Sequence, residues 1–107
     1  MKLQFTSSAI SDLKNISSYI SDVLENPAAA QQLLSTLMTA CTRLKDHPYL
    51  GVTLKQKYGI RKEGYCIACN RHLIVYKINP TTVSIIRILD TRTDCLHILR
   101  AFPMEKS

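Results

Sequence analysis

Hydrophobic residues in the first half of the chain recur at spacings of three and four, which is the period of an amphipathic helix. Between residues 8 and 24 this stripe comprises Ile10, Leu13, Ile16, Tyr19, Ile20, Val23 and Leu24. Ser7 or Ser8 can cap the helix, because a serine oxygen accepts a hydrogen bond from a free N–H of the first turn. Residues 2–6 alternate between apolar and polar instead, which predicts a short strand before the helix.

A second helix is predicted from Pro27 to just before Pro48. Asn26 is a favourable N-cap, and proline suits the first helical position because its missing N–H is not needed there. The apolar stripe of this helix comprises Leu33, Leu34, Leu37, Cys41 and Leu44. The break between the two helices is short, so we expect an antiparallel helical hairpin.

After Pro48 the hydrophobic pattern changes from a helical period to strand-like runs. Residues 49–57 predict a basic loop. Three strands are predicted after it, over residues 60–69, 72–78 and 83–89, with turns at 70–71 and 79–82. The last two runs are apolar on nearly both faces. We therefore expect them to be central strands, covered on at least one side by helices.

The chain ends in a predicted helix over about residues 92–100, which would place Leu96 and Leu99 against the sheet. The order β-α-α-β-β-β-α predicts an α+β fold, a small antiparallel sheet with an N-terminal helical hairpin. The length suits a single domain, residues 1–107. No apolar run approaches the roughly 20 residues that cross a bilayer, and no signal-peptide core follows Met1. We expect a cytoplasmic protein with no membrane partner.

The positive charge is unevenly distributed along the chain. The formal net charge is +6. Residues 1–54 are neutral overall, whereas residues 55–107 carry ten basic and four acidic side chains. Between Lys55 and Leu89 the only acidic residue is Glu63. Such a concentration of charge favours an anionic partner, either a nucleic acid or an acidic peptide.

Cys66 and Cys69 have the spacing of half a metal site. They fall in a predicted strand, however, where a separation of three residues directs the two thiols to opposite faces. No second pair of ligands with suitable spacing follows. The three glycines are scattered and form no phosphate-binding loop. We therefore expect reduced thiols, no bound metal and no cofactor.

The candidate chemistry lies in basic and aromatic residues of the second half: Lys55, Lys57, Arg61, Tyr65, Arg71, His72, Tyr76, Arg87 and Arg92. Such a set can bind a phosphate backbone and stack bases, or hold an acidic protein segment. Each residue also has a structural interpretation, as a solvated charge or a core side chain. Arg87 lies within an apolar strand, so its charge must be paired or face a cleft. Both alternatives stay open for Arg87 and for Arg61.

The ordered motifs of the chain resemble one known family. They are Gly59-Ile-Arg61, Gly64-Tyr65, Arg71-His72-Leu-Ile-Val-Tyr76, Val83-Ser-Ile-Ile-Arg87-Ile-Leu89 and Arg92-Thr-Asp94, preceded by Ala9-x-x-Asp12-Leu13-x-x-Ile16-x-x-Tyr19-Ile20, Asn26-Pro27-x-Ala29 and His47-Pro48-x-x-Gly51. Together they are similar to the RelE/ParE toxin superfamily of type II toxin–antitoxin systems, and most similar to ParE-like toxins. The resemblance covers nearly the whole chain.

This resemblance implies a fold, a partner and an activity. The implied fold is a small antiparallel sheet carrying a two-helix hairpin, and the implied partner is an antitoxin that wraps and neutralises the toxin. ParE-like members inhibit DNA gyrase, whereas RelE-like members cleave mRNA on the ribosome. The residues that match ParE-type positions are Arg61, His72, Tyr76, Arg87, Arg92 and Asp94.

We favour the ParE-like function, with target binding by Lys55, Lys57, Arg61, Tyr65, Arg87 and Arg92. The alternative is a ribosome-dependent endoribonuclease, in which Arg61, His72, Tyr76 and Arg87 would supply charge stabilisation and proton transfer. Asp90 stands where the family usually has histidine, and Cys66 where it often has arginine. Both departures remove groups that would help a ribonuclease, so enzymatic activity stays an open question. A non-toxic relic that only binds antitoxin is a third possibility.

Overall fold

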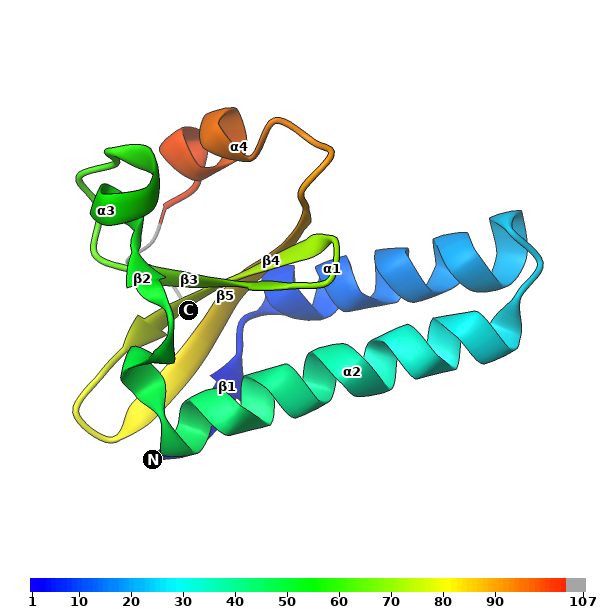
Figure 1. Cartoon of the computed structure of the whole chain (residues 1–107), viewed down its shortest axis with the longest axis horizontal. Helices are drawn as coiled ribbons and strands as arrows, with labels where there is room; N and C mark the ends of the chain where they lie inside the picture. Colours follow the sequence, from blue (N-terminus) through cyan, green and yellow to red (C-terminus); the bar gives the residue numbers. More distant parts are fainter. Residues whose placement is uncertain (104–107) are drawn as a thin grey trace.

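The computed structural model describes residues 1–103, which form a five-stranded sheet between two layers of helices (Figure 1). The elements are β1 (Lys2–Phe5), α1 (Ser7–Ser18), a π-helical turn η1 (Tyr19–Val23), α2 (Pro27–Asp46), a 3-10 turn η2 (Pro48–Leu50), β2 (Val52–Thr53), α3 (Leu54–Tyr58), β3 (Tyr65–Cys69), β4 (His72–Ile78), β5 (Thr82–Asp90) and α4 (Cys95–Ala101). The strand order is β1-β5-β4-β3-β2. The α+β class and the N-terminal helical hairpin are confirmed.

The sheet is mixed rather than wholly antiparallel. The three strand pairs from β2 to β5 are antiparallel, but β1 pairs with β5 in parallel, from Lys2↔Thr82 to Phe5↔Ile85. The connection is long enough for parallel pairing, because the whole helical hairpin and three strands separate β1 from β5. Parallel neighbours need such a long connection. β4 and β5 are inner strands of the sheet, as predicted from their apolar runs.

The cap of α1 differs from the prediction, whereas the cap of α2 agrees with it. Thr6, not Ser7 or Ser8, accepts the hydrogen bond of Ala9 N on its Oγ1 at 3.1 Å. The same hydroxyl donates to Ile86 O at 2.9 Å, so this cap also ties the helix to β5. Asn26 caps α2 by accepting from Ala29 N, as predicted.

The predicted loop over residues 49–57 contains a short strand and a short helix, β2 and α3. Thr53 begins the helix with a capping box, because its side chain accepts from Gln56 N while the Gln56 side chain accepts from Thr53 N. Gly59 ends it in a left-handed conformation with φ of 69°. Five residues are too few to show a helical period, so the hydrophobic pattern missed α3. The strand predicted from residue 60 begins at Tyr65.

Two apolar cores lie on opposite faces of the sheet. The hairpin covers one, which includes Leu37, Ile74 and Ile85, and α3 and α4 cover the other, which includes Leu54, Val75 and Leu99 (Figure 1). Cys66 is buried in the second core, whereas Cys69 packs against the first. The two thiols therefore lie on opposite faces, as their spacing in a strand predicted.

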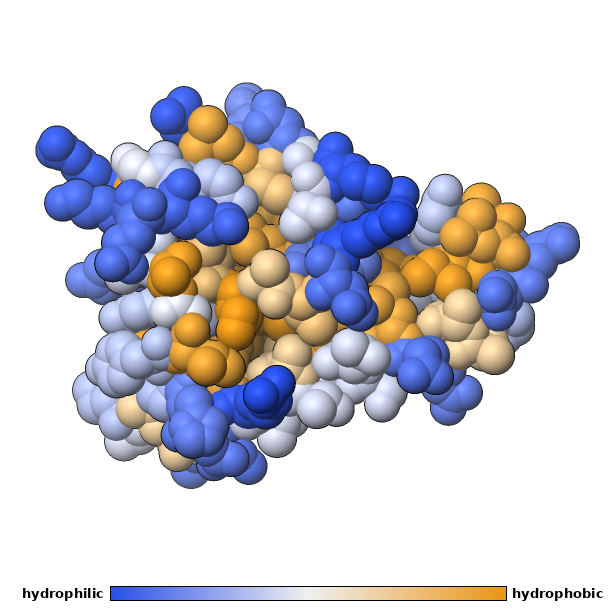
Figure 2. All heavy atoms as spheres, in the orientation of Figure 1, coloured by the Kyte–Doolittle hydropathy of each residue, from blue (hydrophilic) through white to orange (hydrophobic). Residues whose placement is uncertain are grey.

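The outer end of the hairpin extends beyond the sheet. There the predicted apolar stripe of the first helix is exposed, with 51% of Tyr19, 65% of Val23 and 55% of Leu24 open to solvent. Apolar atoms gather over this end of the molecule (Figure 2). The apolar residues at the C-terminal end of the first helix, beyond the sheet, therefore do not belong to the core. None of the helices in residues 1–103 is long and apolar enough to span a membrane.

The last helix, α4, begins at Cys95 with Asp94 as its cap, later than the predicted start. Leu99 is fully buried and Leu96 packs against the same core, as expected. The Lys62 ammonium donates to the carbonyls of Leu99, Arg100 and Phe102 at 2.9, 2.6 and 2.8 Å. A cation at this position satisfies carbonyls that lack partners within the helix. The C-terminal end of α4 is thus fixed to the loop before β3.

Candidate functional site

The basic and aromatic residues singled out from the sequence do not form one site. The structure distributes them over a cleft beside α3, a groove under the hairpin and the open edge of β5. The basic cleft is the cavity of about 860 Å³ lined by Tyr49, Lys55, Arg61, Tyr65 and Lys77, together with Thr53, Ile60, Lys62, Glu63, Gly64 and Ile78. The hairpin groove is the cavity of about 740 Å³ lined by Ile16, Tyr19, Leu24, Leu33, Arg71, His72, Asp90 and Arg92, together with Asn15, Ile20 and Asn70.

Three tyrosines form a ladder that ends in the basic cleft. Tyr76 is fully buried, and its hydroxyl donates to Pro48 O at 2.7 Å and accepts from Gly51 N at 3.0 Å. The Tyr65 ring stacks on the Tyr76 ring with 5.6 Å between centroids. Tyr49 meets Tyr65 edge to face at 5.8 Å and is 70% exposed. Tyr76 is thus a core residue, while its neighbours carry the aromatic surface outward.

The cations of the basic cleft differ in whether they already have an ion-pair or hydrogen-bond partner within the chain. Lys55 and Arg61 are exposed and form no ion pair within the described residues 1–103. Lys77 lies 3.8 Å from Glu63 in a long ion pair, in which the Lys77 side chain is 23% exposed and the Glu63 side chain 88%. Lys62 is unavailable, because its ammonium already binds the end of α4. Two to three positive charges therefore face this cleft.

Sequence reasoning missed Tyr49 and Lys77. Tyr49 follows a helix-ending proline, where no pattern separates it from an ordinary exposed loop residue. Lys77 lies on β4 next to Tyr76, and only the pairing Tyr65↔Tyr76 brings it to the cleft. Lys57 was predicted as a binding residue but does not line the cleft; its Nζ lies 5.8 Å from the ring centroid of Tyr58.

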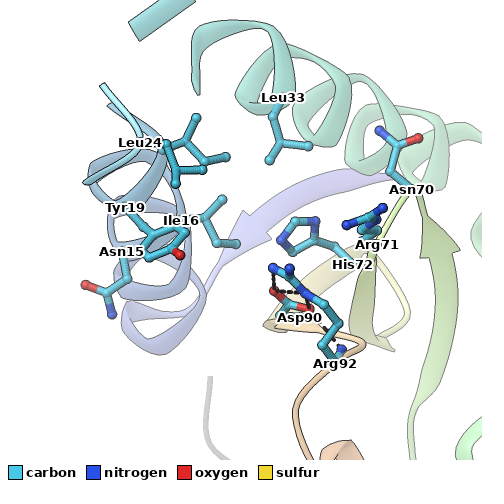
Figure 3. Close-up of a pocket in the computed structure, with 11 residues that line it drawn as sticks. Asn15, Ile16, Tyr19, Leu24, Leu33, Asn70, Arg71, His72, Asp90 and Arg92 are labelled. Carbon is cyan, nitrogen blue, oxygen red and sulfur yellow. Dashed lines mark hydrogen bonds and ion pairs between the residues drawn. The ribbon is translucent and has the colours of Figure 1, made fainter. Parts of the chain in front are cut away.

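The hairpin groove combines an apolar wall with a charged floor. Ile16, Tyr19, Leu24 and Leu33 come from the hairpin and face the ends of β4 and β5 (Figure 3). His72 points into the groove; it is 7% exposed, and its Nδ1 has no hydrogen-bond partner in the described chain. The groove is therefore suited to an apolar segment that also carries polar groups.

The titration of the groove follows from its charges. Burial lowers the pKa of His72 below 6.5, with the Asp90 carboxylate acting in the opposite sense and the Arg92 cation in the same sense. The imidazole is thus held neutral at pH 7. Asp90 accepts from Arg92 Nη2 at 2.7 Å and from Arg92 N at 2.9 Å. The side-chain bond from Arg92, followed by the backbone bond, lowers the pKa of Asp90 to about 2.

The positive charge of Arg87, within the apolar strand β5, is compensated by an ion pair with Asp12. Arg87 Nε and Nη2 donate to the two carboxylate oxygens at 2.8 and 2.9 Å, and Ile88 N donates to the same carboxylate at 2.8 Å. The guanidinium also lies 4.9 Å from the ring centroid of Phe102. β1 ends opposite Ile85, so Asp12 satisfies the open edge of β5 where no strand does. Arg87 therefore has a structural role, because its ion pair with Asp12 joins β5 to α1. A role of Arg87 in target binding stays a prediction.

The four residues that a ribonuclease would use are not assembled as an exposed acid–base group. His72 and Tyr76 lie four residues apart on β4, about 13 Å at the usual strand rise. The Tyr76 hydroxyl already forms two hydrogen bonds with the backbone, and the Arg87 guanidinium is paired with Asp12. Within residues 1–103 no three His, Cys, Asp or Glu side chains come together to hold a metal. Of the four, His72 and Tyr76 are buried and Arg87 is already paired, whereas Arg61 is exposed in the basic cleft.

Comparisons with known proteins agree with this fold. A solved structure described as the chromosomal ParDE toxin–antitoxin system from P. aeruginosa matches with a TM-score of 0.71 at 17% identity, covering 84% of this chain and 95% of that chain. At that identity the likeness shows the fold alone. No curated protein matches the chain in sequence. The family described as the ParE toxin of the type II toxin–antitoxin system parDE matches residues 3–95. The chain therefore belongs to the ParE toxin family of type II toxin–antitoxin systems.

Proposed function

We propose that this toxin acts in the cytoplasm by inhibiting DNA gyrase and that a cognate antitoxin neutralises it. The observation that carries the proposal is the ParE family match over residues 3–95, the branch of the superfamily for which gyrase is the expected target. The chain's own chemistry supports the same conclusion, because the two residues considered for proton transfer in a ribonuclease, His72 and Tyr76, are both buried. His72 is buried and held neutral, and Tyr76 is locked in the core.

The test is a gyrase supercoiling assay with the purified chain, together with a measurement of accumulated cleaved DNA. Inhibition with accumulated cleavage complexes is expected. Lys55→Glu, in the exposed part of the basic cleft, should weaken the effect. Arg43→Glu makes the same charge change on the outer surface of α2, outside the cleft, and should leave the inhibition unchanged.

A folded chain that leaves supercoiling and cleavage unchanged at saturating concentration would overturn the proposal. Primer extension on translated mRNA should then be performed with the same preparation. New cuts that vanish in Arg61→Ala would assign a ribosome-dependent nuclease instead. Expression without any effect on growth would assign a chain that only binds antitoxin.

The hairpin groove supports the antitoxin half of the proposal. Its wall leaves Tyr19 and Leu24 about half exposed, which is unusual for large apolar side chains on one continuous surface. Arg71 on its floor is exposed and carries no ion pair within the described residues. An antitoxin segment with apolar anchors and an acidic residue would cover the wall and neutralise the floor.

Co-purification with the product of the neighbouring reading frame tests this docking site. Leu24→Asp in the groove should abolish capture of the antitoxin, because it buries an unpaired charge in the interface. Met38→Asp is the matched control, since Met38 is also partly exposed but lies on the outer surface of α2. Equal loss of capture in both variants would place the antitoxin elsewhere on the hairpin.

A further inference from the structure

We propose that the basic cleft binds a DNA strand directly, stacking one base on Tyr49 and holding the phosphate backbone with Lys55, Arg61 and Lys77. The inference rests on the proposed function, in which the target is an enzyme with DNA bound. It adds a second contact to that function, because the toxin would bind the nucleic acid as well as the gyrase protein. The aromatic ladder, the charge of the cleft and the close packing of the backbone at Gly51 support it.

Tyr49 offers a ring that is both exposed and fixed. The ring is 70% exposed, yet its edge-to-face contact with Tyr65 holds it from one side. The backbone on either side of it is held by Tyr76, whose hydroxyl bonds Pro48 O and Gly51 N. A preorganised aromatic face loses little entropy when a base stacks on it. Every base has such a face, so the contact needs no particular sequence.

The backbone two residues after Tyr49 packs so closely on the sheet that no side chain fits at Gly51. A Cβ added there would lie 2.5 Å from Cys66 O and 2.7 Å from the Tyr76 hydroxyl. The backbone that carries Tyr49 therefore sits directly on β3, and only glycine permits this approach. The aromatic surface is thus positioned by the sheet rather than by a freely moving loop.

The cations of the cleft are arranged for a phosphate backbone. Lys55 comes from α3, Arg61 from the loop after it and Lys77 from β4, so the charges approach the cavity from separate elements. The one acid among the lining residues, Glu63, is 88% exposed at its side chain and 3.8 Å from Lys77. The pair is long and Glu63 is open to water, so a phosphate can take the place of this carboxylate beside the Lys77 ammonium.

A nucleic acid fits these observations better than an acidic peptide. A peptide carboxylate would use the cations but would leave the exposed Tyr49 ring uncovered unless an aromatic residue stood beside it. The apolar anchors that a peptide normally needs lie in the other cavity, the hairpin groove. Alternating phosphates and bases use both features of the cleft at once.

Fluorescence anisotropy with a labelled dT12 oligonucleotide, titrated at several salt concentrations, tests the proposal without gyrase. Three phosphate contacts on a single strand predict a slope of log K against log salt of about −2. Arg61→Ala should reduce the magnitude of that slope by about 0.7, whereas Arg43→Ala on the outer surface of α2 should not. Tyr49→Ala should weaken binding about 5-fold to 100-fold, and Tyr49→Phe, which keeps the ring, should restore it.

Circular dichroism checks that each variant is folded, which is expected because Tyr49 and Arg61 are exposed. Absence of dT12 binding by the folded wild-type chain would overturn the inference, as would equal weakening by Arg61→Ala and Arg43→Ala. Tighter binding of rU12 than of dT12 would overturn the assignment to DNA. A chain that binds dT12 but leaves gyrase active would overturn the proposed function alone. Gyrase inhibition unchanged by Tyr49→Ala, with no dT12 binding, would overturn only this inference.

Discussion

Removing the Asp12 carboxylate should destabilise the chain strongly, because that single group satisfies three donors at the edge of β5. Asp12 accepts from Arg87 Nε, Arg87 Nη2 and Ile88 N at 2.8 to 2.9 Å. The substitution Asp12→Ala would leave a guanidinium and a backbone N–H without an acceptor. The side chains of both partners are largely buried, since 21% of the Arg87 side chain and 12% of the Asp12 side chain are exposed.

The expected cost follows from these contacts. A hydrogen bond to a charged group contributes about 1.5–3 kcal/mol, and breaking a fully buried ion pair costs about 3–5 kcal/mol. Water can partly replace the lost partner at the exposed fraction of the guanidinium. We therefore expect Asp12→Ala to lower the free energy of unfolding by about 2–4 kcal/mol. Arg87→Ala should cost less, because the remaining carboxylate keeps the Ile88 N–H.

The assay is equilibrium urea unfolding of the wild type, both single variants and the double variant. The resulting cycle isolates the coupling between Asp12 and Arg87, which we expect at about 1–3 kcal/mol for a bidentate, partly buried pair. Raising the salt concentration should reduce this coupling only slightly, since the pair is largely shielded from solvent. A coupling near zero, or a loss below about 1 kcal/mol for Asp12→Ala, would refute the reasoning.

The same variants separate the structural role of Arg87 from a role in target binding. Arg87→Ala alone is a poor probe in a gyrase assay, because it also breaks the link between α1 and β5. Asp12→Ala breaks that link but keeps the cation of Arg87. Inhibition compared at equal folded fraction therefore falls further in Arg87→Ala only if the guanidinium itself contacts the target.

Three further outcomes are expected. Gly51→Ala should lower the free energy of unfolding by about 1–3 kcal/mol, measured in urea, because its Cβ would meet a backbone oxygen at 2.5 Å. Lys62→Met should cost about 1–3 kcal/mol and speed amide hydrogen exchange in α4, since three carbonyls lose a charged donor while the side-chain stem is kept. Bonds from Arg92 lower the pKa of Asp90 from 3.8 to about 2, so the carboxylate stabilises the fold fully above about pH 4 and loses this effect towards pH 2. The stability difference between wild type and Asp90→Asn should therefore shrink over that interval in pH-dependent urea unfolding.

The elements with long regular patterns could be predicted from the sequence, and the short ones could not. Asn26 and Pro27 fix the start of α2 by local chemistry, and the structure keeps that start. By contrast, α3 is five residues long, and its capping box needs only Thr53 and Gln56 in a stretch that otherwise looks like a basic loop. The parallel pairing of β1 depends on which strand lies beside it, and a strand's own alternation carries no information about its neighbour.

The candidate site was less predictable because strand pairing and bulges decide where a side chain points. The pairs Val75↔Arg87 and Tyr76↔Ile85 leave Ile86 as an extra residue, which shifts the alternation of β5. Ile85 and Ile88, three residues apart, therefore pack in the same core, and Arg87 between Ile86 and Ile88 is turned to the open edge of the strand. A linear pattern can show that Arg87 needs a partner, but it cannot identify Asp12, 75 residues earlier, as that partner.

The separation of the two surfaces bears on how an antitoxin would neutralise this toxin. His72 in the hairpin groove and Lys77 in the basic cleft lie five residues apart on β4, about 17 Å at the usual strand rise. The two sets of lining residues have no member in common. A short segment seated in the groove would leave the cleft open, so neutralisation could proceed without covering the cations. An antitoxin that also covers them needs at least five more extended residues and acidic side chains at their end. Anisotropy with dT12 on the toxin–antitoxin complex would thus show which part of the toxin the antitoxin blocks.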